Sequence, residues 1–243
     1  MTKLKVLILC EESQRICMEF RKLNHNAFSC DLQDCSGGHP EFHIKGNVFQ
    51  VIHHDGRDVT FSTMDGTMHR ILRFDLVICH PCCRFLSNAG ARYLNRDKYG
   101  KSAIERIFNR QKAILDFLDF VSLCEHISDH YAIENPIGCM SEVYRAPDQI
   151  IQPWQFGDNV QKSTCLWLKN LPPLQIECET RPEPDYVYHT NRNGKTSRFE
   201  RFFYETRFLP EADRRRERSK TFPGIARAIA SQWGDYLLQN LRP

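Results

Sequence analysis

The sequence predicts an α/β fold with a parallel central sheet. Residues 4–10, 75–79 and 131–133 form short apolar runs that end abruptly in polar or reactive residues. Such runs are typical of strands that are buried on both faces and deliver side chains to the carboxyl edge of an open sheet. A helical pattern and a second apolar run ending at Asp31 follow the first of them, so the chain opens as a βαβ unit. We therefore predict a Rossmann-like sheet.

Turn residues and apolar spacing predict the other elements. Ser13 is expected to cap the first helix, because it directly precedes apolar side chains that recur at helical spacing. The most sustained helical periodicity covers residues 102–124, and the polar, glycine-punctuated segment 87–101 before it is predicted to be a mobile loop. Further elements are predicted as strands at 26–30, 48–52 and 164–168 and as a last helix at 224–241.

The texture of the sequence changes near Gln149, where prolines begin to interrupt short strand-like pieces. We place a domain boundary there. Residues 1–148 are expected to form a Rossmann-like catalytic domain and residues 149–220 a small lobe that recognises the substrate or DNA. Residues 221–243 are expected to be a C-terminal helix that packs back on the first domain.

The composition is that of an ordinary globular chain, since 41% of the 243 residues are hydrophobic and 26% are charged. No apolar run approaches the roughly 20 residues that cross a bilayer, and residues 1–5 lead directly into a strand, so we expect a cytoplasmic protein with no membrane partner. The 11 cysteines are odd in number and are expected to be reduced. The net charge is +3, but cations crowd residues 192–220, as in a solvated basic face or a surface that contacts phosphates.

Two kinds of reactive group follow predicted central strands, the adjacent thiols of Cys82 and Cys83 and the carboxyl of Glu134. A thiol and a carboxyl at one sheet edge are what an enzyme needs to add a nucleophile to C6 of a pyrimidine while holding its N3 and exocyclic amine. Burial is expected to raise the pKa of Glu134 until the neutral acid donates a hydrogen bond. The alternatives are core thiols and an acid that caps a helix or forms a salt bridge.

A metal site is also considered, because Cys79, His80, Cys82 and Cys83 lie close together in the sequence. Structural zinc sites use spaced pairs of ligands, whereas the potential ligands here are crowded or scattered, so we expect no metal. The chain has neither a P-loop nor a GxGxxG sequence after its first strand, which disfavours hydrolysis of nucleoside triphosphates. A cofactor without phosphates, held by an acid at the end of the second strand, is favoured instead.

Three segments carry a resemblance to a known family: the Pro-Cys sequence ending at Ser87, the Glu-Asn-Pro sequence at 134–136 and the closing helix at 222–230. Together they resemble the cytosine C5 DNA methyltransferases. A compact, phage-associated group of that superfamily is more similar still, in the stretches 30–40, 80–90, 134–138 and 150–174. The similarity covers nearly the whole chain and implies a Rossmann-like class I S-adenosylmethionine-dependent methyltransferase sheet with a small C-terminal lobe.

The resemblance implies which residues are catalytic. When Ser87 is laid on the serine of the family motif Pro-Pro-Cys-Gln-x-Phe-Ser, Pro81 falls on the first proline and Cys83 on the nucleophile. Cys82 replaces the second proline, and a shift of one residue would make Cys82 the nucleophile. Glu134 matches the glutamate that grips N3 and the amine of a flipped cytosine.

The resemblance also implies S-adenosylmethionine as the cofactor. The glycine-rich first motif of the family is replaced here by residues 9–13, where Glu11 and Ser13 are expected to supply polar contacts. Asp31 corresponds to the acid that holds the ribose, and Asn47 to the group that meets the adenine. The side chains expected to bind the cofactor are those of Cys10, Glu11, Ser13, Asp31, Asn47, His80 and Pro81.

DNA is the implied partner, with the target cytosine flipped out of the duplex into the pocket. Residues 87–101 are expected to close over the base as a lid. The side chains expected to contact the substrate or the DNA are those of Arg84, Ser87, Asn88, Asn135, Lys162 and Arg198. The resemblance thus implies a DNA cytosine-5 methyltransferase that acts through a covalent cysteine adduct at C6.

Two other functions are weighed. The missing glycine motif, Cys82 in place of proline and the small lobe also suit a diverged methyltransferase fold that binds cofactor or nucleic acid without catalysis. Methylation of an exocyclic amine fits poorly, because residues 80–83 lack the polar acceptor and the aromatic residue of that motif. The pattern specifies no oligomeric state.

Overall fold

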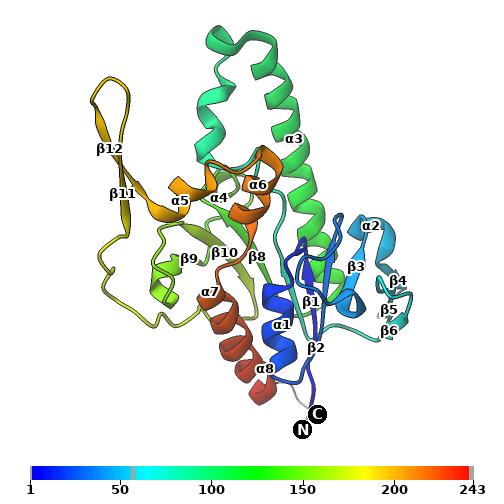
Figure 1. The fold of residues 1–243 in the computed structure, drawn as a ribbon. Coiled ribbons are helices and arrows are strands. Elements are labelled where there is room, and N and C mark those ends of the chain that lie inside the picture. The colour runs from blue at the N-terminus through cyan, green and yellow to red at the C-terminus, as the bar shows by residue number, and fades with distance from the viewer. Residues whose placement is uncertain (1, 56–57, 241–243) are drawn as a thin grey trace.

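A mostly parallel, seven-stranded sheet forms the centre of the protein in the computed structural model, which describes residues 2–55 and 58–240 (Figure 1). The strand order is β3-β2-β1-β7-β8-β10-β9, and only the pairings of β10 with β8 and β9 are antiparallel. The strands are β1 (Lys5–Leu9), β2 (Asn26–Asp31), β3 (His43–Lys45), β7 (Leu76–Cys79), β8 (Tyr131–Pro136), β9 (Gln149–Ile151) and β10 (Thr164–Lys169). The predicted α/β class with a Rossmann-like parallel sheet is compatible with this architecture.

The central strands β1 and β7 are buried on both faces because their side chains alternate between two hydrophobic clusters. Leu7 of β1 is paired with Val77 of β7, and both belong to one cluster. The next pair along, Ile8 with Ile78, belongs to the other. This double burial explains why both strands read as continuous apolar runs in the sequence.

Helices cover both faces of the sheet (Figure 1). One face is covered by α1 (Arg15–Lys22), α7 (Pro223–Ala228), the π-helical turn η4 (Ile229–Trp233) and α8 (Gly234–Asn240), whose apolar side chains belong to one of the two clusters. The other face is covered by α3 (Arg96–Ile127), which begins before the predicted helix and is interrupted at Gly100 (φ 50°). The predicted loop 87–101 is therefore largely helical and consists of the 3-10 helix η2 (Asn88–Leu94) and the first turn of α3.

A second, three-stranded sheet packs beside the main one, with β4 (His53–Asp55), β5 (Asp58–Ser62) and β6 (Met68–Ile71) in that order. Its Phe61 contacts Phe28 of β2 edge to face, with ring centroids 5.1 Å apart. The prediction of a strand at 48–52 is wrong, because the structure forms the one-turn helix α2 (Val48–Val51) there. Asn47 caps this helix by accepting a hydrogen bond from the Phe49 N–H at 3.1 Å.

The predicted boundary near Gln149 does not coincide with the end of the main sheet. Strand β9 begins at that residue and β10 lies beyond it, and both complete the sheet, so the part that leaves the sheet begins after Lys169. The 3-10 helices η1 (Pro40–Phe42) and η3 (Pro153–Phe156) and the short helix α4 (Met140–Val143) connect strands of the sheet.

The part of the chain after Lys169 contains the hairpin of β11 (Tyr186–Thr190) and β12 (Thr196–Glu200), which projects from the body, followed by α5 (Arg201–Thr206) and α6 (Glu211–Ser219) (Figure 1). Among the described residues, no helix combines the length and the apolar character needed to cross a membrane.

Candidate functional site

The carboxyl ends of three neighbouring strands bring together residues that are far apart in the sequence. Strands β1, β7 and β8 are adjacent and parallel, so the loops that follow them start at the same edge of the sheet. The loop after β1 carries Glu11, the loop after β7 carries His80 and Cys83, and Glu134 lies in the last half of β8. This edge is the candidate active site.

The loops that follow β7 and β8 are bonded to each other. The buried Asn135 side chain donates from Nδ2 to the Pro81 carbonyl at 2.7 Å. The Cys139 N–H donates to the Leu86 carbonyl at 3.0 Å. A Cβ at Gly138 would overlap the same Leu86 carbonyl oxygen, so only glycine permits this approach. These contacts hold the cysteine-bearing loop in a fixed position relative to the end of β8.

Glu134 forms a hydrogen bond and ion pair with His80, whose Nδ1 lies 3.1 Å from the carboxylate Oε2. Burial raises the pKa of Glu134, but the hydrogen bond and charge of His80, the charge of Lys162 and a hydrogen bond from Thr164 together bring that pKa below its ordinary value. The expectation that burial keeps Glu134 neutral is therefore wrong. The group at the end of β8 is a carboxylate, because cations and donors surround it.

Cys82 and Cys83 are both accessible to water. Protein atoms around Cys83 nevertheless remove part of the hydration of its thiolate. This desolvation, together with the negative charge of Glu134, raises the pKa of the Cys83 thiol to about 11. Lys162 acts in the opposite direction. Cys83 is therefore a thiol at neutral pH, and it shares its electrostatic environment with Glu134.

Lys162 and the segment before α7 close one side of this edge. The Lys162 ammonium donates to the Arg218 carbonyl at 2.9 Å and lies 5.8 Å from the centroid of the Phe222 ring. Between Lys162, Phe222 and the His80–Glu134 pair remains a narrow cleft of about 20 Å³. Such a volume holds about one water molecule, so a pyrimidine ring fits only if neighbouring loops move.

Glu11 is occupied by the first helix of the fold. Its carboxylate accepts hydrogen bonds from the N–H groups of Ile16 at 2.7 Å and Cys17 at 3.2 Å, at the N-terminus of α1. Ser13 was expected to cap this helix, but the structure uses the longer side chain of Glu11, because Gln14 at the N-cap adopts a left-handed conformation (φ 57°). Burial raises the pKa of Glu11 to about 7, against the lowering influence of His80 and the two N–H groups.

Glu12 is a site residue that the sequence analysis did not identify. Its side chain is 6% exposed, and neither carboxylate oxygen has a hydrogen-bond partner in the described part of the chain. Asp31, at the end of β2, has a pKa raised mainly by burial and in part by the charge of Glu12. The doubled acid directly after β1 was the available signal. Two neighbouring carboxylates at these strand ends suit a ligand that carries hydroxyl groups or positive charge.

The remaining predicted residues are distributed unevenly. Cys10 and Ser13 lie in the turn after β1, and Ser87 and Asn88 lie in the loop that contacts the end of β8. Arg84 is exposed beside the Phe85 ring at 5.2 Å. Two residues have separate structural roles: Asn47 caps α2, and Arg198 stacks on Tyr186 at 4.5 Å within the projecting hairpin.

The strand-end site thus combines a thiol, an imidazole, an ammonium group and several carboxylates at one edge of the sheet, where His80, Glu134 and Lys162 line the narrow cleft. A cysteine at this edge would be a nucleophile in its thiolate form. Resemblance to other proteins does not extend this description, since the chain matches no protein-family model and no curated protein.

Proposed function

We propose that the protein transfers a methyl group from S-adenosylmethionine to C5 of cytosine in DNA. The observation that supports this most is the meeting of Cys83 and Glu134 at the adjacent ends of β7 and β8, with their loops bonded together. Methyl transfer to C5 of cytosine requires a thiol near C6 and a carboxyl near N3 of the same ring. The mostly parallel seven-stranded sheet supports the proposal, since it is compatible with the class I sheet that the resemblance implies.

The residues after β1 and β2 fit S-adenosylmethionine in their chemistry. Asp31 would accept hydrogen bonds from ribose hydroxyls, and the unpartnered carboxylate of Glu12 would receive the amino group of the methionine moiety. When bound, S-adenosylmethionine supplies an electrophilic methyl group. Glu11 would contribute indirectly, because its carboxylate is engaged with α1.

The ionisation states of the two main residues define the first proton transfer. Glu134 begins as a carboxylate and Cys83 as a thiol, so the thiol proton moves to the carboxylate as the sulfur adds to C6 of cytosine. The neutral Glu134 then donates this proton to N3. His80 positions the carboxylate throughout, through its 3.1 Å hydrogen bond. After methyl transfer, loss of the C5 proton to a base in solution expels the Cys83 thiolate, and the N3 proton returns through Glu134 to the sulfur.

Substrate entry requires the cleft to open. Flipping the base out of a duplex costs a few kcal/mol, and the narrow space beside Glu134 must widen to admit the ring. The segment from η2 to the first turn of α3 directly follows the cysteine-bearing loop, and Gly100 interrupts its helix. We infer that this segment moves as the lid.

The test is methylation of DNA with radiolabelled S-adenosylmethionine. Cys83→Ser should abolish labelling of cytosine, whereas Cys82→Ser, the matched neighbour, should only weaken it. The reverse pattern would assign the nucleophile to Cys82. Wild-type protein that binds both cofactor and DNA and never labels cytosine would refute the proposed activity.

A second candidate is a diverged methyltransferase fold that binds cofactor or nucleic acid without catalysis. It is favoured by the narrowness of the cleft and by the pKa of about 11 for Cys83, which both disfavour thiol addition. DNA that contains 5-fluorocytosine separates the two, because methyl transfer to this base leaves the protein covalently attached. A cofactor-dependent adduct, resolved by denaturing electrophoresis, would support the enzyme, and reversible binding alone would support the binding protein.

A further inference from the structure

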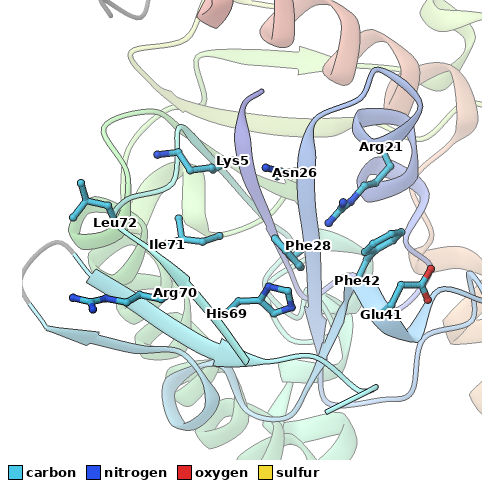
Figure 2. Close-up of a pocket in the computed structure, with 10 residues that line it drawn as sticks. All are labelled: Lys5, Arg21, Asn26, Phe28, Glu41, Phe42, His69, Arg70, Ile71 and Leu72. Atoms are coloured by element: carbon cyan, nitrogen blue, oxygen red, sulfur yellow. The ribbon is translucent and has the colours of Figure 1, made fainter. Parts of the chain in front are cut away.

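A cavity of about 460 Å³ lies at the opposite end of the sheet from the candidate active site. Its lining includes the first residues of β1 and β2, Lys5 and Asn26, whereas the candidate active site follows the last residues of these strands. Residues of α1, η1 and β6 complete the walls, so the cavity lies between the main sheet and the three-stranded sheet (Figure 2). Its size is that of sites for small organic ligands.

Arg21 is held in a fixed orientation at this cavity. Its Nε donates to the Ala27 carbonyl at 2.8 Å, and its guanidinium carbon lies 3.7 Å from the centroid of the Phe42 ring and 4.9 Å from that of Phe28. Figure 2 shows the guanidinium directed between these two rings. The cation is thus oriented before any ligand arrives, which reduces the entropy lost on binding.

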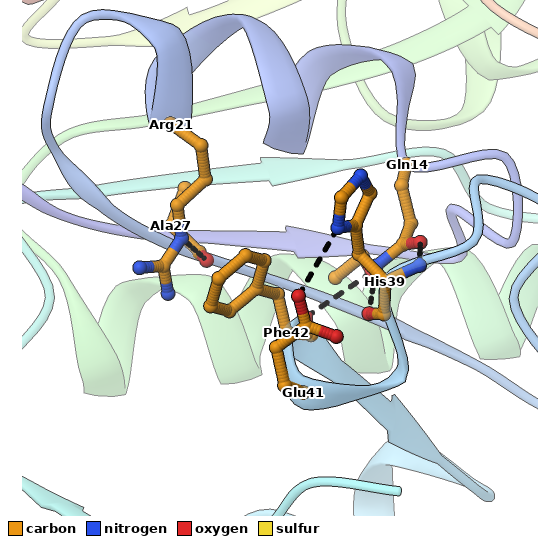
Figure 3. A network of polar contacts seen from close by, with 7 residues as sticks. Gln14, Arg21, Ala27, His39, Glu41 and Phe42 are labelled. Carbon is orange, nitrogen blue, oxygen red and sulfur yellow. Dashed lines mark hydrogen bonds and ion pairs between the residues drawn. The ribbon is translucent and has the colours of Figure 1, made fainter. Parts of the chain in front are cut away.

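A second set of contacts fixes Phe42 from its other side (Figure 3). The His39 ring stacks on Phe42 with centroids 5.9 Å apart and an interplanar angle of 17°. Gln14 holds the His39 backbone through two hydrogen bonds, of 2.8 and 3.1 Å, and the His39 Nδ1 lies 3.1 Å from a Glu41 carboxylate oxygen. The platform beneath Arg21 is therefore itself rigid.

Arg21 forms no ion pair among residues 2–55 and 58–240, although the charge of Glu41, which also lines the cavity, acts to raise its pKa. No carboxylate in this part of the chain lies within ion-pair distance of the Arg21 guanidinium. The two terminal nitrogens of Arg21 donate no hydrogen bond to an oxygen of the described residues. The other cations of the cavity are paired, Lys5 with Asp75 and Arg70 with Asp58. Burial lowers the pKa of Arg21, but a guanidinium remains charged at neutral pH.

We propose that this cavity binds a small organic phosphate, whose phosphomonoester group accepts two hydrogen bonds from the terminal nitrogens of Arg21. A guanidinium fork matches the geometry of phosphate oxygens. The cavity is much larger than a phosphate ion, and its apolar walls of Phe28, Ile71 and Leu72 suit the organic part of the ligand. This inference does not depend on the proposed methyl transfer.

The test is calorimetric titration of the full chain with ribose 5-phosphate and with the four ribonucleoside 5′-monophosphates. Inorganic phosphate and the corresponding nucleosides are the comparison ligands. We expect at least one phosphomonoester to bind and Arg21→Gln to weaken it at least tenfold. The neighbouring Lys22→Gln should have no effect, because Lys22 is exposed and paired with Glu19. Asp31→Asn should also have no effect, which separates this cavity from the proposed cofactor site.

Leu72→Glu provides a second variant in case Arg21→Gln perturbs folding. Leu72 is 64% exposed and lines the cavity, so a carboxylate there should repel the phosphate tenfold or more without disturbing the core. Three outcomes would overturn the proposal: no phosphomonoester binds, binding survives both substitutions, or inorganic phosphate binds as tightly as every organic one. A carboxylate-bearing ligand that competes equally would reassign the cavity to organic acids.

Discussion

At Glu134, three neighbouring groups outweigh the effect of burial. His80 and Thr164 provide hydrogen bonds and His80 and Lys162 provide charge, so the carboxylate is favoured although its side chain is only 23% exposed. The same carboxylate raises the pKa of Cys83, and Lys162 lowers it. The pKa of the thiol is therefore raised mainly by burial and then adjusted by two opposite charges, one on β8 and one in the segment before β10.

Thiol alkylation tests this balance without reference to any activity. In a Cys82→Ser background, Glu134→Gln should accelerate alkylation of Cys83 by iodoacetamide about threefold to tenfold at pH 8, because the thiolate fraction rises tenfold for each unit by which its pKa falls. Lys162→Gln should slow it. Peptide mapping measures the rate, with the exposed Cys178 as the internal reference. A rate in Glu134→Gln that equals or falls below that of the parent would contradict the electrostatic account.

At the scale of elements, α1 depends on one buried carboxylate at its N-terminus. Glu11 satisfies two of the N–H groups that have no partner within the helix, and its pKa of about 7 lies above the ordinary value of 4.5. Between these pH values the folded protein binds more protons than the unfolded chain. The free energy of unfolding therefore decreases as pH rises through this window, by up to about 3 kcal/mol.

Urea denaturation between pH 5 and pH 7.5 measures this dependence. Relative to the wild type, Glu11→Gln should lose most of the decline over that interval, while its overall stability falls by about 1 kcal/mol because one N–H loses its acceptor. Glu19→Gln on the same helix should keep the wild-type slope, since Glu19 forms an exposed pair with Lys22. Equal slopes for the wild type and Glu11→Gln would show that Glu11 is not the titrating group.

Elements with strong local signals were predictable, and those that depend on tertiary contacts were not. Strands β1 and β7 could be predicted from continuous apolar runs in the sequence, because both of their faces are buried. The helix α2 has only four residues, two of them valine, so the sequence favours a strand where packing and the Asn47 cap produce a turn of helix.

The residues of the candidate site were likewise predictable where the signal is local and hidden where it depends on tertiary contacts. The sequence indicated that Cys83 and Glu134 end neighbouring strands, because apolar runs followed by polar residues are visible locally. The ionisation of Glu134 depends on His80, 54 positions earlier in the chain, and no sequence pattern reports that distance. The membership of β9 and β10 in the main sheet was equally hidden, since it depends on pairing with β8.

At the scale of the molecule, four of the ten basic residues between Arg192 and Lys220 form ion pairs, and Lys220 with Glu217 is one of these pairs. Arginines of α5 and α6 form ion pairs: Arg201 with Asp185 and Glu205, Arg215 with Glu211, and Arg216 with Asp213. Arg192, Lys195 and Arg198 of the projecting hairpin form no ion pair with another described residue. Arg207, Arg214 and Arg218 form none either, but their guanidinium groups stack on an aromatic ring or donate to protein oxygens. The hairpin therefore offers three cations without ion pairs to the phosphates of a bound DNA.

Salt-dependent DNA binding tests the hairpin. The triple variant R192Q/K195Q/R198Q should bind a duplex more weakly and reduce the slope of log affinity against log salt concentration by up to about 3, at roughly 0.9 per lost phosphate contact. Fluorescence anisotropy at several salt concentrations measures both quantities. The control K22Q/K45Q/K112Q removes the same formal charge from paired positions. Equal slopes for the two triple variants would exclude the hairpin as a DNA contact.

The insertion of β10 between β8 and β9 also has a consequence for biosynthesis. Because β9 precedes β10 in the chain but pairs only with it, a nascent polypeptide that ends before Thr164 has no partner for either β9 or the outer edge of β8. Unpaired edges of apolar strands are where polypeptides associate with one another. The growing protein is thus most exposed to aggregation just before Thr164–Lys169 leaves the ribosome, and a premature stop in this interval would yield an insoluble fragment.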